Sequence, residues 1–208
     1  TPGGGFNTIG NADLRWETSK QTDIGVDASL LKDRINFTFD WYKRDINGLI
    51  FAAPTSQTIG FGSITKNIGS MVNKGVEFTI NASPVKTKNF SWDISFNISH
   101  NHNEFTKIAP TALGYTTNGS FLVEPGHDFY EFYLREWAGV DPATGSPTWY
   151  LDTANTKTTT SYTSAPLIPT GKSASPKVFG GLSNTFTYKQ FNFTSDFYYN
   201  YGNYVQDQ

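Results

Sequence analysis

The chain has 208 residues, a formal net charge of −2 and no cysteine, and 16% of its residues are aromatic. The lack of cysteine excludes a disulfide framework, a thiolate metal site and a cysteine nucleophile. The scattered basic residues give no electrostatic footprint for nucleic acid, and no run approaches the 18 or so apolar residues of a membrane-spanning helix.

Apolar and polar residues alternate along two segments near the start of the chain, 23–30 and 35–42. Their apolar members are Ile24, Val26, Ala28, Leu30, Ile35, Phe37, Phe39 and Trp41. Successive side chains of a strand point to opposite faces, so each segment predicts a strand with one apolar and one polar face. Residues 31–34 form the brief turn between them.

A region rich in Gly, Ser and Thr, 47–72, predicts a long loop before two more alternating segments, 75–82 and 90–102. The second is the most informative part of the chain, because Phe90 to Ser99 alternate without interruption. Strands of soluble sandwiches usually have about 5 or 6 residues, whereas about ten residues cross a bilayer when tilted by roughly 45°. The apolar face would then contact lipid and the polar face a water-filled lumen.

A second long region, 104–176, precedes the last two predicted strands, 177–188 and 191–201. Membrane barrels have short periplasmic turns and long extracellular loops, which places turns 31–34, 84–89 and 189–190 in the periplasm. Residues 104–176 then contain an even number of crossings, most simply none. We expect one extracellular excursion there, in which 129–134 pairs with 148–151 beyond a turn at 141–145.

Six crossings cannot close a barrel, because single-chain barrels have eight strands or more and lipid does not tolerate open sheet edges. The N-terminal residues also lack the basic stretch and apolar core of a signal peptide. We therefore expect this chain to be part of a longer polypeptide that supplies the other strands.

Several motifs follow one another in a specific order. They are NADLRWET (11–18), QTDIGVD (21–27), DWYKR (40–44), NIGSMVNKGVE (67–77), AGVDPATG (138–145), PKVFGGL (176–182) and the segment 198–204 around Tyr201-Gly202-Asn203. Their order resembles the C-terminal part of the barrel in SusC/RagA-type TonB-dependent transporters, over nearly the whole chain. The motif at 67–77 is the most specific.

The resemblance implies a 22-stranded β-barrel with an N-terminal plug in the outer membrane of a Gram-negative bacterium. Such a barrel imports large nutrients, commonly oligosaccharides or peptides, using TonB and the proton-motive force. The implied partners are a SusD-like surface lipoprotein, TonB through the missing N-terminal part, the remaining strands and plug, and outer-membrane lipid. The alternative from the residues alone is a secreted β-sandwich module that binds glycans.

Two sets of aromatic residues are candidate site residues. Exposed loop aromatics offer flat faces to sugars or peptides, although each could instead pack its own loop or the lipoprotein; they are Phe61, Tyr115, Trp137, Trp149 and Tyr150. A second set would lie at the lipid interfaces as an aromatic girdle: Trp41, Trp92, His100, Tyr199 and Tyr201.

Metal binding and catalysis are the competing interpretations of other polar residues. His100 and His102 could supply two metal ligands, but no third lies nearby in the sequence, and interface residues are the simpler interpretation. The inward carboxylates could form a glycosidase pair, yet they are spread over five strands, which favours a lumen lining: Asp23, Asp27, Asp40, Glu77, Asp93 and Asp196. We expect no catalytic residue, no cofactor and no metal.

Overall fold

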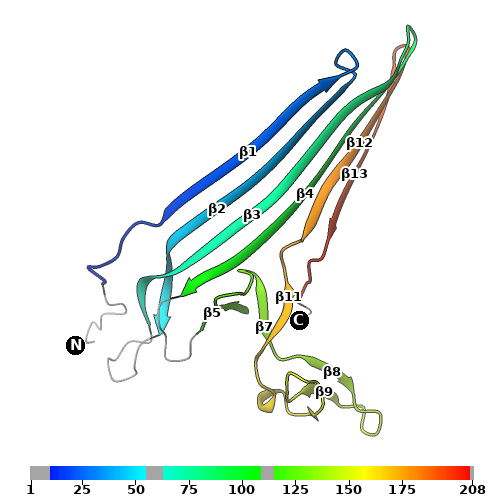
Figure 1. Cartoon of the computed structure of the whole chain (residues 1–208). Helices are drawn as coiled ribbons and strands as arrows, with labels where there is room; N and C mark the ends of the chain where they lie inside the picture. Colours follow the sequence, from blue (N-terminus) through cyan, green and yellow to red (C-terminus); the bar gives the residue numbers. More distant parts are fainter. Residues whose placement is uncertain (1–9, 55–62, 109–114, 207–208) are drawn as a thin grey trace, which may run out of the picture.

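The computed structural model describes residues 10–54, 63–108 and 115–206, and its main feature is one curved antiparallel sheet of six long strands (Figure 1). The strands are β1 (Thr18–Leu30), β2 (Ile35–Pro54), β3 (Ser63–Lys86), β4 (Phe90–Ile108), β12 (Val178–Tyr188) and β13 (Phe191–Tyr201). They are neighbours in the order β1-β2-β3-β4-β12-β13. All six predicted strands and the antiparallel all-β fold are confirmed. Among the described residues no helix is long and apolar enough to cross a membrane.

The strand registers bring the apolar positions of all six strands onto one face. One row across the sheet consists of Ile24, Trp41, Val76, His100, Val178 and Tyr201. This face lies open, because Ile24 is 60% exposed and Phe193 is 64% exposed. A sandwich would bury these side chains under a second sheet, so the sandwich alternative does not describe this chain.

The polar side chain of Asn184 lies on the apolar face and finds a partner there. Asn184 of β12 lies opposite Ile94 of β4 in the register. The indole Nε1 of Trp92 donates a hydrogen bond to Asn184 Oδ1 at 3.2 Å. Because an unsatisfied amide is costly in an apolar environment, this bond makes Asn184 tolerable on the face.

The predicted loop at 47–72 is wrong for most of its length. β2 and β3 continue to pair until Pro54 lies opposite Ser63, so only residues 55–62, which lie outside the described part, separate them. The register shifts between Asn47 and Ile50, where Gly48 takes a positive φ of 75°. Such a bulge changes the phase of the alternation without ending the strand, and the pattern is lost there for this reason. β4 likewise extends past residue 102 to Ile108.

Residues between β4 and β12 form two small sheets that are separate from the large one. The strands are β5 (Thr116–Asn118), β6 (Phe121–Val123), β7 (Glu131–Leu134), β8 (Trp137–Val140), β9 (Pro147–Tyr150), β10 (Thr158–Thr159) and β11 (Ile168–Ser173), with a 3-10 helix at Tyr162–Ser164. One small sheet has the order β11-β7-β6-β5 and the other β10-β9-β8. None of these strands joins the six-stranded sheet. We call this region the excursion.

The predicted pairing of 129–134 with 148–151 is also wrong. β7 pairs with β11 and β6, whereas β9 pairs with β8 across the predicted turn at 141–145. The turn itself is present: Gly145 N donates to Asp141 O at 2.8 Å, and hydrogen bonds from Ala143 N and the Thr144 hydroxyl lower the pKa of Asp141. A tight turn joins the residues directly beside it, so β9 takes its neighbour β8 as partner.

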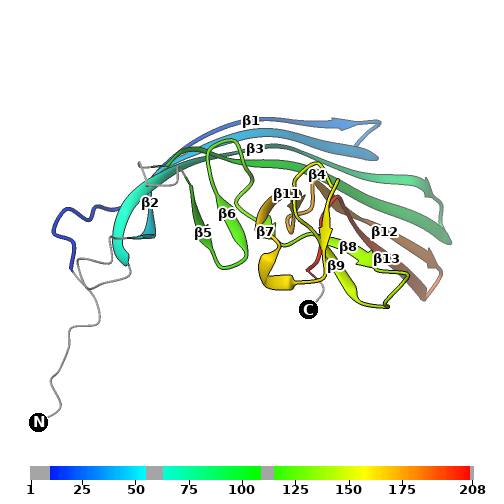
Figure 2. The same cartoon turned by 90° about the horizontal axis from the view of Figure 1, so that it is seen from below.

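A buried apolar cluster attaches the excursion to the concave face of the large sheet (Figure 2). Its buried members are Leu49, Met71, Phe105 and Val123. Phe105 is completely buried, and its ring lies 5.5 Å from that of Phe129. Burying such a side chain contributes about 1.5–3 kcal/mol. Met71 and Phe105 continue the polar face of β3 and β4, so this face becomes apolar where the excursion covers it.

Two tyrosines lie across glycines of neighbouring strands, one on each face of the sheet. The Tyr199 hydroxyl passes over Gly180 and donates to Asn97 O at 3.0 Å. The Tyr42 hydroxyl passes over Gly75 and donates to Asn101 Oδ1 at 3.0 Å. An aromatic ring over a glycine restores packing where the strand lacks a side chain.

We expect Gly180→Ala to destabilise the folded protein by about 1–3 kcal/mol, because the new methyl group would overpack this site. The added Cβ would lie 2.6 Å from Tyr199 Oη and even closer to Asn97 O. Thermal unfolding of the detergent-solubilised protein measures the change. Gly181→Ala is the matched control, since its Cβ would meet its nearest neighbour at 3.3 Å. Equal midpoints for the two variants would contradict the argument.

Candidate functional site

A large cleft lies in the excursion, between its two small sheets. It has a volume of about 830 Å³. Its lining includes Arg135, Glu136, Trp137, Trp149, Tyr162 and Lys172. The C-terminal residues 204–206 also line it, so five separate parts of the chain meet there. A cleft of this size that combines aromatic and charged side chains is a suitable site for a ligand.

Three aromatic rings form the wall of the cleft. Trp137 of β8 lies opposite Trp149 of β9, with ring centroids 6.0 Å apart and planes at 82°. Trp149 contacts Tyr162 in the same way, at 5.2 Å and 72°. Edge-to-face packing holds the rings against one another and leaves Trp137 53% and Tyr162 54% exposed. Rigid, exposed aromatic faces can stack on sugars or apolar peptide side chains.

Charged side chains lie beside these rings. The Arg135 guanidinium lies 4.7 Å from the centroid of the Tyr162 ring, and its Nε donates to Ala165 O at 2.9 Å. Lys172 Nζ forms an ion pair with Glu136 Oε1 at 3.1 Å. The guanidinium is thereby fixed over the ring by a cation–π contact. The cleft thus offers both hydrogen-bond donors and a carboxylate to a polar ligand.

The structure brings two of the five predicted ligand-contacting residues together. Trp137 and Trp149 line the cleft. Tyr150 follows Trp149 in β9 and therefore points to the opposite face. Tyr115 lies elsewhere, with its ring 5.4 Å from that of Tyr133. Phe61 lies outside the described residues.

The predicted girdle residues fall into register rows. Trp41, His100 and Tyr201 share one row, and Tyr199 lies in the next. Trp92 lies near the other end of the strands, where its ring stacks on Phe186 with centroids 5.6 Å apart. The arrangement has aromatic side chains towards both ends of the apolar face.

Sequence reasoning missed Arg135, Tyr162 and Lys172 as cleft residues. Tyr162 carries the same signal as the predicted aromatics, an exposed ring in a long loop region. Lys172 meets Glu136 across 36 positions of sequence, and no local pattern indicates such a pairing. Only the β7–β11 pairing brings them into contact.

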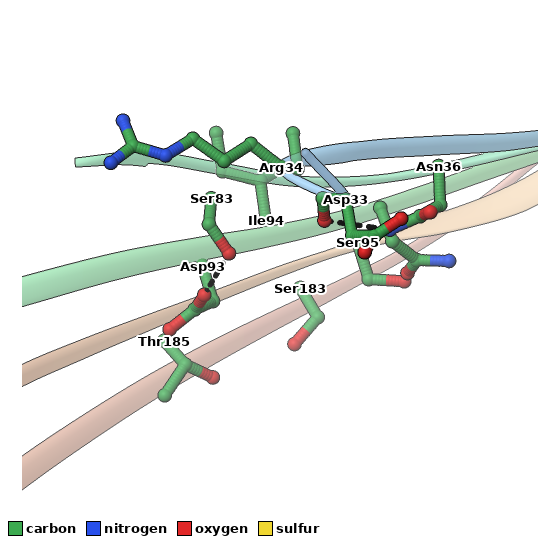
Figure 3. A pocket seen from close by; sticks show the side chains of 11 residues that line it. Asp33, Arg34, Asn36, Ser83, Asp93, Ile94, Ser95, Ser183 and Thr185 are labelled. Carbon is green, nitrogen blue, oxygen red and sulfur yellow. Dashed lines mark hydrogen bonds between the residues drawn. The ribbon is translucent and has the colours of Figure 1, made fainter. Parts of the chain in front are cut away.

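The polar face of the large sheet has two shallower hollows. One of about 640 Å³ is lined by residues that include Asp23, Asp40 and Glu77. The other, of about 190 Å³, lies near the hairpin turns, where Ser83 donates a hydrogen bond to Asp93 (Figure 3). In the described part of the chain, no three His, Cys, Asp or Glu side chains are placed to hold a metal ion.

The two histidines with metal-ligand spacing have separate protein contacts. His100 Nδ1 lies 2.7 Å from Lys177 O, and His102 Nε2 lies 3.1 Å from Glu104 Oε2. The two rings therefore have different partners, and their position at the lipid interface stays a prediction.

A buried glutamate holds the base of the excursion together. Glu131 of β7 is 8% exposed; its Oε1 accepts a hydrogen bond from Gly171 N at 3.0 Å, and its Oε2 lies 2.9 Å from His127 Nδ1. Gly171 in β11 has a positive φ of 66°. Glu131 therefore connects β7 to a distorted part of β11 and fixes the strand that leads to the cleft.

Comparisons with known proteins were made on the whole chain. The family model described as TonB dependent receptor-like, beta-barrel matches residues 1–208. The chain is 39% identical over 132 residues to TonB-dependent receptor P39 of Formosa agariphila, which covers 64% of this chain and 12% of that protein. It is 41% identical over 99 residues to TonB-dependent receptor SusC of Bacteroides thetaiotaomicron; this match covers 47% of this chain and 10% of that protein.

A solved structure is similar over nearly all of the fold. The structure of the RagAB peptide transporter matches with a TM-score of 0.81 and 30% sequence identity, covering 95% of this chain and 22% of that chain. The chain thus spans about a tenth of the curated relatives and about a fifth of the solved one.

We expect Glu131→Ala to loosen the excursion, because Gly171 N and His127 Nδ1 both lose the carboxylate that joins them to β7. A hydrogen bond to a charged group contributes about 1.5–3 kcal/mol. Limited proteolysis of the folded protein should cut residues 115–176 faster in this variant. Glu136→Ala is the matched control, since it removes only the partly exposed ion pair with Lys172, worth about 0–1 kcal/mol. Identical cleavage rates in both variants would contradict the role of Glu131.

We expect alkaline pH to weaken the packing around Tyr133. Burial, followed by the hydrogen bond to Tyr115, raises the pKa of Tyr133 from 10.0 to about 12. A raised folded-state pKa means that the unfolded chain deprotonates first, so this contribution is complete below about pH 10 and is lost as the pH rises towards about 12. Tyr115→Phe should lower the pKa of Tyr133, which a pH titration of phenolate absorbance measures. The part of the absorbance that disappears in a further Tyr133→Phe variant belongs to Tyr133. An unchanged pKa in Tyr115→Phe would contradict this assignment.

Proposed function

Because the chain belongs to the TonB dependent receptor-like β-barrel family, we propose that it is the C-terminal part of the barrel of a transporter that imports a large nutrient. The barrels of this family, including SusC and RagA, lie in the outer membrane of Gram-negative bacteria, and this chain is part of such a wall. The named relatives are receptors and transporters. A transport role needs no catalytic residue.

The open apolar face across six strands is the observation that carries this proposal. In water such a surface would cause the protein to aggregate. In a membrane the same surface contacts the lipid acyl chains, as the outer face of a β-barrel does. β1 and β13 also have one edge each without a partner among the described strands. Since lipid does not tolerate open edges, further strands of the same protein would pair with both.

The orientation of the barrel follows from the connections. The three short turns would lie in the periplasm and the excursion of residues 104–176 outside the cell, as is usual for such barrels. Trp41, His100, Tyr199 and Tyr201 would then form the outer aromatic girdle, with Trp92 at the inner interface. The excursion, attached to the concave face, would lie over the mouth of the lumen.

The cleft formed by Trp137, Trp149 and Tyr162 is the proposed contact for the nutrient, an oligosaccharide or a peptide. Exposed rings beside Arg135 and the Glu136–Lys172 pair suit either class, through stacking and hydrogen bonds. The similar RagAB assembly is a peptide transporter, which supports peptides as one class to test.

We propose two protein partners as well. A SusD-like surface lipoprotein would cover the excursion, which is supported by the similarity to SusC and to the RagAB assembly. TonB would supply energy through a part of the protein outside this chain.

We expect Trp137→Ala with Tyr162→Ala to weaken nutrient uptake by the complete transporter at least roughly fivefold, because the change removes two stacking faces worth about 0.5–1.5 kcal/mol each. Uptake of labelled oligosaccharides and peptides by intact cells is the measurement. Trp16→Ala is the matched control, since Trp16 is 92% exposed and does not line the cleft. Full uptake by the double variant would remove the cleft from the pathway. Failure of the wild type to take up either class would contradict the proposed nutrient.

A further inference from the structure

The three hairpin turns at one end of the sheet are unusually basic. Together with the adjoining strand ends they carry one acid, Asp33, and five cations: Lys32, Arg34, Lys86, Lys88 and Lys189. All five cations are exposed. None forms an ion pair with a carboxylate of the described residues. We call this group the basic rim.

Backbone contacts place the turns side by side at the upper end of the sheet in Figure 1. Lys189 N donates to Asn89 O at 2.8 Å, which joins the β12–β13 turn to the β3–β4 turn. Ser83 N donates to Arg34 O at 2.8 Å, which joins the end of β3 to the β1–β2 turn. Figure 3 shows the Arg34 guanidinium extending away from Asp33 and Asp93. The positive charges therefore lie at the same end of the sheet, and none of them forms an ion pair with these neighbouring acids.

The basic rim borders exposed apolar side chains of the lipid-facing surface. Leu31 is 71%, Tyr188 54% and Phe191 69% exposed. Lys189 Nζ lies 5.5 Å from the centroid of the Tyr188 ring. Cations beside an aromatic belt lie at the depth of lipid headgroups, where their aliphatic stems remain in the apolar layer.

Two of the lysines occupy strained backbone positions. Lys32 has a φ of 59° and Lys189 a φ of 53°. Glycine or asparagine would adopt this left-handed conformation at lower cost. Leu31 and Asp33 have a positive φ as well, of 53° and 64°, so the β1–β2 turn as a whole is left-handed.

From these observations we propose that the basic rim, Lys32, Arg34, Lys86, Lys88 and Lys189, binds the phosphate groups of anionic phospholipids in the inner leaflet of the outer membrane. The assignment to the inner leaflet rests on the proposed orientation of the transporter. The binding itself depends only on the unneutralised charge and the adjacent lipid-facing rings. Each basic residue near a charged membrane surface strengthens such binding several-fold, and salt screens it.

The test uses the complete transporter purified in an uncharged detergent and titrated with phosphatidylglycerol. Its thermal midpoint should rise with phosphatidylglycerol and much less with phosphatidylcholine, and high salt should reduce the effect. Lys88→Gln with Lys189→Gln should raise the phosphatidylglycerol concentration needed for half of the effect roughly tenfold. Lys88→Arg with Lys189→Arg should retain the wild-type response. Lys107→Gln with Lys157→Gln, outside the rim, is the charge-matched control.

Lys189→Asn separates charge from backbone strain. Asparagine tolerates the positive φ, so the lipid-free midpoint should stay level or rise, while the response to phosphatidylglycerol should weaken. A parallel loss in the Lys107/Lys157 control, an equal response to phosphatidylcholine, or full competition by inorganic phosphate would overturn the proposal. Labelling of the rim on the surface of intact cells would overturn the inner-leaflet assignment. If the wild-type transporter showed this lipid selectivity but took up neither oligosaccharides nor peptides, the result would count against the proposed transport function and not against lipid binding.

Discussion

Hydrogen-bond register between neighbouring strands is the constraint on which the rest of this structure depends. Each strand alternates with a period of two, so a slip of one residue in any pair would move apolar side chains of that strand to the polar face. Between the bulges of β2, β3 and β4 the register is regular, and a row such as Trp41, Val76 and His100 stays on one side. The open apolar face and the polar concave face both follow from it. Membrane placement then needs no further special feature.

The same register determines where the excursion attaches. On β3 and β4 the concave positions change from polar residues such as Asn73 and Asn103 to the apolar Met71 and Phe105. Asn103 lies at this boundary: its Nδ2 donates to Asn73 Oδ1 at 2.6 Å, and its Oδ1 accepts from Phe129 N at 2.9 Å. The excursion is therefore fixed to the inner side of the wall by both polar and apolar contacts. This positions the aromatic cleft over the concave side of the sheet.

The sequence predicts strands whose residues alternate between apolar and polar, but it does not predict pairings between strands that are distant in the chain. The six strands were predictable because each carries its own alternation, and the turn at 141–145 because its residues favour a tight bend. The extension of β2 and β3 was not predictable, because the bulge at Gly48 changes the phase of the alternation between apolar and polar residues. The pairing of β7 with β11 joins residues more than 30 positions apart, and neither strand carries a local sign of its partner. Trp137 and Trp149 were found as exposed loop aromatics, whereas Lys172 reaches the cleft only through that pairing.

The unequal lengths of the strands make the wall uneven in height. β13 ends at Tyr201, in the same row as Trp41 and Val76, whereas β2 continues to Pro54 and β3 begins at Ser63. At about 3.4 Å per residue this difference is roughly 40 Å along the strands. The sheet is therefore tall beside β2 and β3 and low beside β12 and β13, at the end where the excursion leaves it.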